Sequence, residues 1–195
     1  MEPIILASAS PQRQEYFRLL GLPFSVMSSF IDEEIEQGTD PRKTAEGLAV
    51  RKVQKVVELL DGRKPSWICG ADTIVSVDGG IFGKPADRED AKRMLRRLAG
   101  REHEVITAVA LHRRPAGNTD CRSAACAVTF ASLSEDEIEW YLDTGEWQKA
   151  AGAYRIQGLA GCFISSITGS PSAVVGLPLR DFYVMLRENG YPYGA

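Results

Sequence analysis

An Asp78-Gly79 pair between two apolar runs is the feature that most constrains how this chain can fold. Residues 67–77 and 80–83 both have the composition of strands, and an Asp-Gly pair at this spacing is typical of a two-residue hairpin turn. Part of the sheet must therefore be antiparallel. Further strands are predicted at residues 4–7, 105–111, 126–131 and 163–167, a loop at 113–120, and helices at 10–21, 41–60, 87–100, 134–143 and 178–188. This mixture, without a strict strand–helix alternation, predicts a mixed α/β (α+β) fold.

The length and charge of the chain limit its possible functions. Its 195 residues fit one domain, residues 1–195, with a substantial core. The 23 basic and 26 acidic residues give a net charge of −3, which argues against nucleic-acid binding because that needs a broad cationic face. Four cysteines without a Cys-x-x-Cys pair argue against structural zinc, and His103 is expected to be structural. Without a signal peptide or an apolar run of about 20 residues, we expect a cytoplasmic protein with no membrane contact.

The first candidate site lies where the strand at residues 4–7 meets the next helix. Ser10 and a following proline place a helix N-terminus there, whose free N–H groups and dipole favour an anion. Arg13 falls in the first helical turn, where a cation is unfavourable unless an anion lies close by. One hypothesis is a phosphate cradle formed by Ser8, Ser10 and Arg13. The alternative is an ordinary turn with an exposed arginine.

Lys52 lies on the apolar face of the predicted helix at residues 41–60. The rest of that face consists of Ala45, Leu48, Ala49, Val53, Val56, Val57 and Leu60. A lysine on a buried face must be paired or must extend toward solvent. Lys52 therefore either turns its ammonium group into a pocket that binds phosphate or reaches solvent from the edge of the face.

Asp72 interrupts the predicted strand at residues 67–77, on the same face as Ile68 and Ile74. Aspartate is rare in strands, and burial would make this carboxylate a better base. Extending the register of the hairpin places Lys84 beside Asp72. The functional interpretation is a carboxylate–ammonium pair in an active site. The alternative is an exposed aspartate that holds a turn at the end of the strand.

Two further segments have the composition of ligand-binding loops. Asp32, Glu33 and Glu34 offer the oxygen ligands that Mg²⁺ prefers, although their spacing also fits a solvated acidic loop. Residues 151–158 are rich in small side chains and include Gln157, whose amide carries the donor and the acceptor needed to read the edge of a base. A glycine-rich surface loop is the alternative for this segment.

Five segments, in chain order, resemble motifs of the Maf family of nucleoside triphosphate pyrophosphatases. The family motifs are LAS-x-SPRR, (I/V)DE, ADT…KP, AGAYGIQG and VGLPL. The matching segments are Leu6–Arg13, Ile31–Glu33, Ala71–Thr73 with Gly83–Pro85, Gly152–Gly158 and Val175–Leu179. The resemblance extends from about residue 4 to residue 186. Residues 94–100, 107–111 and 161–163 are most similar to the branch that prefers dTTP and UTP.

The resemblance implies the fold of inosine-triphosphate pyrophosphatases, a curved mixed sheet flanked by helices with a cleft between two lobes. It implies hydrolysis of dTTP, UTP or other pyrimidine triphosphates to the monophosphate and pyrophosphate, with Mg²⁺ or Mn²⁺ as cofactor, in a homodimer. Carried over to this chain, it implies Asp72 as general base, with Glu33 and Asp72 as metal ligands. Lys52 and Lys84 would be further catalytic residues, and Arg13 a phosphate ligand. Substrate choice would depend on Gln12, Thr73 and Gln157.

Two positions depart from the family motifs. Gln12 replaces an arginine, which removes one cation from the predicted phosphate cradle. Ala150 stands where the family has a lysine, and Lys149 lies one position away. An alternative function therefore stays open, that of a nucleotide-binding regulator of cell division with little turnover.

Overall fold

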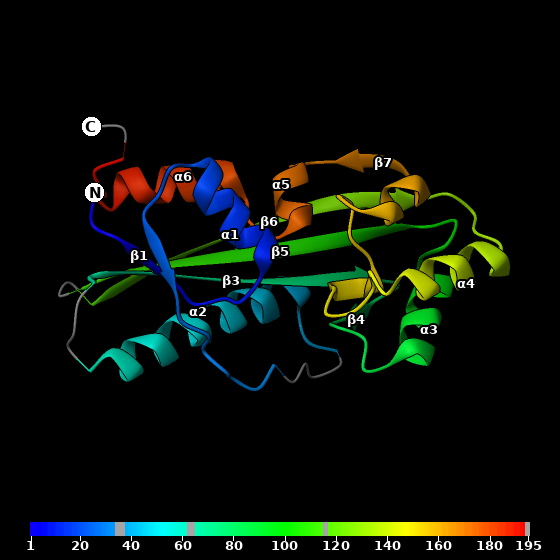
Figure 1. The fold of residues 1–195 in the computed structure, drawn as a ribbon, viewed down its shortest axis with the longest axis horizontal. Coiled ribbons are helices and arrows are strands. Elements are labelled where there is room, and N and C mark those ends of the chain that lie inside the picture. Colours follow the sequence, from blue (N-terminus) through cyan, green and yellow to red (C-terminus); the bar gives the residue numbers. More distant parts are fainter. Residues whose placement is uncertain (34–37, 62–64, 115–116, 194–195) are drawn as a thin grey trace.

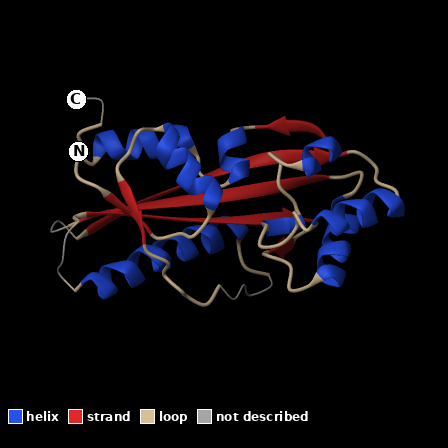
Figure 2. Ribbon diagram, in the orientation of Figure 1, coloured by secondary structure: helices blue, strands red, loops and turns tan. Residues whose placement is uncertain are grey.

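The computed structural model describes residues 1–33, 38–61, 65–114 and 117–193, which form a seven-stranded mixed sheet with helices on both faces (Figures 1 and 2). The strands lie in the order β2-β1-β3-β5-β6-β7, and β4 pairs with the end of β3. The predicted mixed α/β fold is confirmed. The strands are β1 (Ile4–Leu6), β2 (Phe24–Val26), β3 (Trp67–Val77), β4 (Gly80–Phe82), β5 (Glu102–Arg113), β6 (Asn118–Phe130) and β7 (Ile164–Thr168).

The sheet is parallel on one side of β3 and antiparallel on the other. β1 pairs in parallel with both β2 and β3, whereas β3, β5, β6 and β7 pair antiparallel in that order. The hairpin between β3 and β4 turns at Asp78 and Gly79, whose φ angles are 47° and 74°. Positive φ at both turn residues is what a two-residue turn requires to match the twist of its strands. The predicted hairpin is therefore confirmed.

Helices cover both faces of the sheet and one of its ends (Figure 1). On one face lie α1 (Pro11–Leu19), α5 (Pro171–Val175) and α6 (Leu179–Glu188), on the other lies α2 (Pro41–Leu60), and at the end far from the N-terminus lie α3 (Arg88–Leu98) and α4 (Glu135–Thr144). Short 3₁₀ helices at Ala151–Ala153 and Leu159–Phe163 interrupt the loop from α4 to β7. Among the described residues, no helix has the length and apolar character that a membrane span requires.

Capping residues account for where three of the helices begin. The side chains of Asp40, Asp87 and Ser134 each accept a hydrogen bond from the backbone N–H three residues further on. Glu137 returns a bond to the backbone of Ser134, which completes the predicted capping box. Ser10 occupies the N-cap position of α1, but its side chain makes no capping bond.

The alternation of side chains along the strands separates two cores. Leu6 packs with Phe17 of α1 on one face of the sheet, whereas Ile5 packs with the apolar side of α2 on the other. Along β3 the same alternation directs Asp72 toward α2 and Thr73 toward α1 and α5. Two consecutive residues therefore serve opposite faces of the sheet.

One edge of β3 is uncovered between two partner strands. β1 pairs with Trp67–Cys69 and β4 pairs with Val75–Val77. In the part of the chain that the structure describes, no strand pairs with residues 70–74 on this edge. Asp72 and Thr73 lie in this interval, so side chains from both faces of the sheet reach the same opening.

The hairpin of β5 and β6 is longer than predicted. The prediction ended one strand at residue 111 and began the next at residue 126, with a loop at residues 113–120. In the structure, pairing continues to Arg113 opposite Asn118. The prediction was wrong because residues 118–125 are mostly small or polar, and this part of β6 is only half buried.

Candidate active site

A cavity of about 1290 Å³ opens where the edge of β3 is uncovered. Its walls come from α1, α2, β3 and the loops at residues 28–33 and 149–157. It brings together Ser8, Ser10, Gln12, Arg13, Glu33, Lys52, Asp72, Thr73, Lys84 and Gln157, all of which the sequence singled out for catalysis, binding or specificity. Asp32, the first residue of the acidic segment, does not line it. Glu34, the third residue of the acidic segment, lies outside the described residues.

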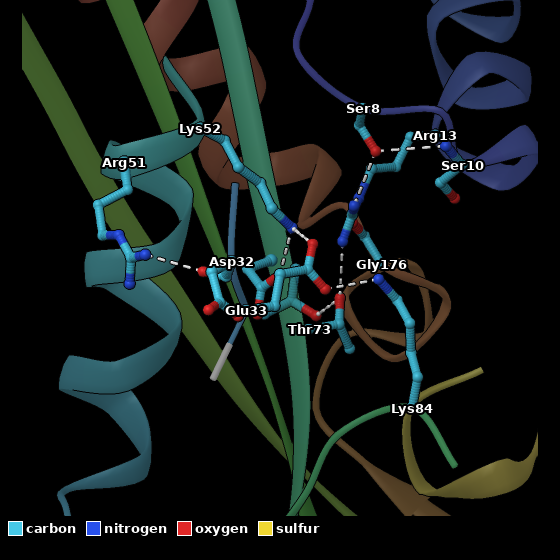
Figure 3. A network of polar contacts seen from close by, with 12 residues as sticks. Ser8, Ser10, Arg13, Asp32, Glu33, Arg51, Lys52, Thr73, Lys84 and Gly176 are labelled. Atoms are coloured by element: carbon cyan, nitrogen blue, oxygen red, sulfur yellow. Dashed lines mark hydrogen bonds and ion pairs between the residues drawn. The ribbon is translucent and has the colours of Figure 1, made fainter. Parts of the chain in front are cut away.

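Lys52 is held between two carboxylates (Figure 3). Its side chain is 7% exposed, and its Nζ lies 2.6 Å from Oδ1 of Asp72 and 2.7 Å from Oε1 of Glu33. Helix α2 approaches β3 this closely because residue 70 is glycine: a Cβ there would lie 2.8 Å from the carbonyl oxygen of Ala49. The ammonium group therefore does not extend to solvent from the edge of the helix. It joins the two carboxylates in the wall of the cavity.

Lys84 pairs with Glu33, which corrects the predicted contact between Lys84 and Asp72. Strand β4 ends at Phe82, so the register of the hairpin does not extend to residue 84. The Nζ of Lys84 lies 2.6 Å from Oε2 of Glu33 instead. Lys52, Asp72, Glu33 and Lys84 thus form a continuous charged cluster, in which Glu33 binds both lysines.

The charged cluster keeps Glu33 ionised. Burial on its own would raise the pKa of Glu33, but the ammonium groups of Lys52 and Lys84 outweigh it and lower this pKa to about 2. Because the folded pKa lies below the ordinary value of 4.5, this contribution to stability is present above about pH 4.5 and is lost as the pH falls toward 2.

Arg13 is buried, with its guanidinium nitrogens bound to three different segments (Figure 3). Nε donates to the carbonyl oxygen of Gly176 (2.8 Å), Nη1 to Oγ of Ser8 (2.9 Å) and Nη2 to Oγ1 of Thr73 (3.1 Å). The alternative of an exposed arginine at a plain turn is therefore wrong. These bonds use three of the five N–H groups of an arginine, so two remain for a ligand in the cavity.

Ser8 and Ser10 use their hydroxyl groups differently. The oxygen of Ser8 accepts bonds from Arg13 and from the backbone N–H of Ser10 (3.3 Å), which leaves its hydrogen to donate into the cavity. Ser10 donates to Oε1 of Gln12 (3.1 Å). Gln12 therefore keeps its two amide N–H groups for a ligand, without the positive charge that an arginine would bring.

The segment between α4 and β7 forms another wall of the cavity. Gln157 and Lys149 line this wall with exposed side chains. The ammonium group of Lys149 makes no ion pair or hydrogen bond with any other described residue, in contrast to the lysines of the charged cluster. Arg155 holds the segment by donating to the carbonyl oxygens of Glu146 (2.8 Å) and Gln148 (2.6 Å). Lys149 therefore offers the cavity an ammonium group without a partner among the described residues, on a loop that Arg155 holds in place.

His103 does not line the cavity but anchors one of its walls. Its Nε2 lies 2.8 Å from the hydroxyl oxygen of Tyr154, which belongs to the segment that carries Gln157. Burial lowers the pKa of His103 to about 4, so the ring is neutral near pH 7. The placement agrees with the expected structural role.

Glu33 and Asp72, the predicted metal ligands, share Lys52 as a counter-ion. Within the described ranges there is no group of three or more His, Cys, Asp or Glu side chains that could hold a metal ion. Mg²⁺, however, is usually held by one or two carboxylates, with water and substrate phosphates as its other ligands. Two adjacent carboxylates at the cavity therefore fit a cation that arrives with a triphosphate.

Sequence reasoning missed one part of the site. Thr107 of β5 lies 2.9 Å from Thr73, oxygen to oxygen. A threonine within a strand gives no local signal. The pairing of β3 with β5, which sets Thr73 opposite Thr107, is the only information that could have revealed it. The carbonyl group that binds Arg13 belongs to Gly176, within the motif at Val175–Leu179.

Comparison with known proteins adds independent findings. The sequence matches the family described as "Maf-like protein" over residues 3–189, a range that includes all five motifs. It is 46% identical over 193 residues to a dTTP/UTP pyrophosphatase of Symbiobacterium thermophilum, with 98% of this chain and 96% of that relative covered. It is 44% identical over 187 residues to a dTTP/UTP pyrophosphatase of Hahella chejuensis, with 96% and 92% covered. The Staphylococcus aureus Ham1 protein aligns with a TM-score of 0.47 at 14% identity, over 67% of this chain and 72% of that one.

Proposed function

This chain belongs to the Maf family, and from that premise we propose that it is a nucleoside triphosphate pyrophosphatase acting on dTTP and UTP. Water attacks the α-phosphorus, the bond from this phosphorus to the oxygen bridging to the β-phosphorus breaks, and the products are the nucleoside monophosphate and pyrophosphate. The observation that carries the proposal is a carboxylate, Asp72, fixed by Lys52 in a cavity that Arg13 and Lys84 also line. The names of the relatives support the same activity.

Asp72 is the general base of the proposed reaction. Its Oδ1 is bound to Lys52, which is its only polar side-chain partner among the described residues, so Oδ2 is left to accept a proton from the attacking water. The residue is 6% exposed and lies on the uncovered edge of β3. The ion pair thus holds the carboxylate in one orientation toward the cavity.

Arg13, Ser8 and Lys84 hold the triphosphate. Negative charge develops on the phosphate oxygens and on the departing pyrophosphate, and donors fixed in advance stabilise that charge at little reorganisation cost. Arg13 has two N–H groups left for this purpose, and Ser8 has its hydroxyl hydrogen. Lys84 is about half exposed at the cavity, where its charge faces an incoming ligand as well as Glu33.

Glu33 and Asp72 would hold the divalent cation, Mg²⁺ or Mn²⁺, together with phosphate oxygens of the substrate. When bound, such an ion neutralises charge on those oxygens. The residues of this chain prepare the position, because Lys52 holds both carboxylates within 2.7 Å of its Nζ and so fixes them relative to each other.

Gln157 selects the pyrimidine, with Gln12 and Thr73 acting at the phosphate end. The edge of thymine or uracil presents two carbonyl oxygens on either side of one N–H group, and a glutamine amide can pair with the N–H and one oxygen. A hydrogen bond that one base makes with this amide and another base cannot make is worth about 0.5–1.5 kcal/mol, or roughly two- to tenfold in affinity. The proposal therefore ranks dTTP and UTP above purine nucleotides and, because cytosine reverses part of the pattern, above CTP.

We also propose that the protein acts in the cytoplasm as a homodimer, as the resemblance to the family implies. Light scattering at micromolar concentration tests the assembly. A single species at the 21.4 kDa mass of one chain would contradict it.

Product analysis tests the activity. The purified chain is incubated with dTTP, UTP, CTP or GTP and Mg²⁺ or Mn²⁺, and the products are separated and identified. Monophosphate with pyrophosphate supports the proposal, and kcat/KM should be highest for dTTP and UTP. Diphosphate with phosphate would place cleavage at the γ-phosphorus instead. Binding without any product would favour the alternative of a nucleotide-binding regulator, and a clear purine preference would contradict the assigned substrates.

A further inference from the structure

We propose that Thr107 is a positioning residue that fixes the orientation of Arg13 through Thr73, and thereby sets how tightly the cavity holds pyrophosphate. The inference rests on the proposed function, because it takes Arg13 as a phosphate-binding side chain. Thr107 has no exposed surface, so it acts on a ligand only through other residues. Its hydroxyl group contacts that of Thr73, the residue opposite it on β3, and Thr73 in turn contacts Arg13.

The direction of every hydrogen bond in this chain of contacts is determined. Oγ1 of Thr107 donates to the carbonyl oxygen of Ala173 at 2.7 Å, which uses its only hydrogen. In the 2.9 Å contact between the two threonines, Thr73 must therefore be the donor. An arginine can only donate, so the 3.1 Å contact from Nη2 of Arg13 ends on the oxygen of Thr73. Donation thus runs from Arg13 to Thr73, then to Thr107, then to Ala173.

This order decides what Thr73 can do. Its hydrogen is committed to Thr107, so Thr73 has no hydrogen to donate to a substrate. Its oxygen faces the guanidinium group of Arg13 as an acceptor. Without Thr107, the hydroxyl of Thr73 would be free to rotate and to point its hydrogen at the guanidinium group. The influence of Thr73 on substrate therefore passes through Arg13.

The same network closes through α5 and the residue that follows it. Thr107 binds the carbonyl group of Ala173, and Nε of Arg13 binds that of Gly176, three residues later. Gly176 has a φ of 127°, and a Cβ at this position would lie 3.4 Å from Oγ1 of Thr73. Arg13 is therefore held on two sides by one short segment and by the pair of threonines, and Thr107 contacts both.

Binding of inorganic pyrophosphate to the full chain tests the inference without requiring turnover. Calorimetry with Mg²⁺ present compares the parent with T107V, T107S, T73V and the double variant T73V/T107V. Valine keeps the shape of threonine without its hydroxyl, so Thr73 is released to turn its hydrogen toward Arg13. T107V should therefore raise the Kd about tenfold, the effect of losing the charge-assisted bond from Arg13 to Thr73. T107S restores the hydroxyl and should stay within about twofold of the parent. The double variant should bind no more weakly than T73V, because Thr107 acts through Thr73.

T129V is the matched control, since Thr129 of β6 lies on a neighbouring strand and outside the network. Thermal unfolding of each variant separates stability from binding. The inference is overturned if T107V binds pyrophosphate like the parent, if T107S is no better than T107V, or if the effects of T73V and T107V add. If T107V does not fold, T73V interrupts the same series of hydrogen bonds at Thr73, which is only half buried. Parent-like binding by T73V would overturn the inference too. Failure of the proposed function is distinct, because it shows as a parent chain that releases no pyrophosphate from dTTP.

Discussion

The Nζ of Lys52 and Oδ1 of Asp72 lie 2.6 Å apart, and both side chains are more than nine-tenths buried. A buried ion pair is weak evidence for stability, because apolar residues of similar volume often serve a core as well or better. Here the pair stands in the wall of a cavity lined by further cations. Its presence is therefore best explained by the chemistry of that cavity, and the first two predictions separate this role from folding.

The substitution Asp72→Asn should abolish most turnover while the chain stays folded. Asparagine keeps the shape and can accept a bond from Lys52, but it cannot take a proton from water. We expect kcat for dTTP to fall by about 10²–10⁴-fold, the usual contribution of a general base. Asp78→Asn, at the exposed hairpin turn, is the matched control and should retain parental kcat. Near-parental kcat in D72N would exclude Asp72 as the base.

The substitution Lys52→Met should destabilise the fold, because it leaves Asp72 and Glu33 without their shared counter-ion. Breaking a buried pair by removing one partner costs about 3–5 kcal/mol of unfolding free energy. Lys55→Met, at an exposed position of the same helix, should change this free energy by less than about 0.5 kcal/mol. Urea titration measures both. If K52M proved as stable as K55M, the pair would not be buried in the way described.

Removing the charge of Lys149 should weaken nucleotide binding rather than catalysis. Its ammonium group lines the cavity, and no other described residue pairs with it. We expect Lys149→Ala to raise KM for dTTP about fivefold at low salt, with kcat nearly unchanged. The increase should shrink at high salt, because an exposed charge is screened. Lys43→Ala, an exposed lysine at the start of α2 that does not line the cavity, should leave KM unchanged. If the two substitutions raised KM equally, the effect of Lys149 would come from the overall surface charge and not from its place at the cavity.

The buried ring of His103 should make stability fall with pH below neutrality. The unfolded chain takes up a proton near pH 6.5, whereas burial lowers the folded pKa to about 4. The unfolded state therefore binds more protons within this window, and the free energy of unfolding decreases as the pH falls from 6.5 to 4. Between pH 7 and pH 5, the parent should lose about 2 kcal/mol more than His103→Gln, which cannot titrate. Parallel pH profiles of the two proteins would contradict the burial of a neutral ring.

Local signals in the sequence were enough to predict most elements and to pick out residues that line the cavity. Asp40, Asp87 and Ser134 marked helix starts because a cap depends on residues within one turn. Arg13, Lys52 and Asp72 were noticed because each breaks the pattern of its own element, and all three line the cavity. A polar residue in the wrong local place is informative before any tertiary contact is known.

Contacts between elements were beyond such reasoning. Lys84 was assigned to Asp72 by counting along the hairpin, but β4 ends at Phe82 and the lysine reaches Glu33. Thr107 was missed because its importance comes from the residue opposite it on β3 and from the carbonyl group of Ala173. Such partners are set by where strands stop and how helices dock, which no short window of sequence contains.

The cavity at the uncovered edge of β3 also links the stability of the fold to ligand binding. Arg13 comes from the layer of helices on one face and Lys52 from the helix on the other, so a chain with one layer docked has half a binding site. A ligand that needs both residues, such as the proposed triphosphate, would bind the folded chain and not a chain that lacks one of these layers. By mass action it protects the folded chain, by about 2.7 kcal/mol at one hundred times its Kd. The free energy of unfolding should therefore fall as the concentration of bound ligand falls.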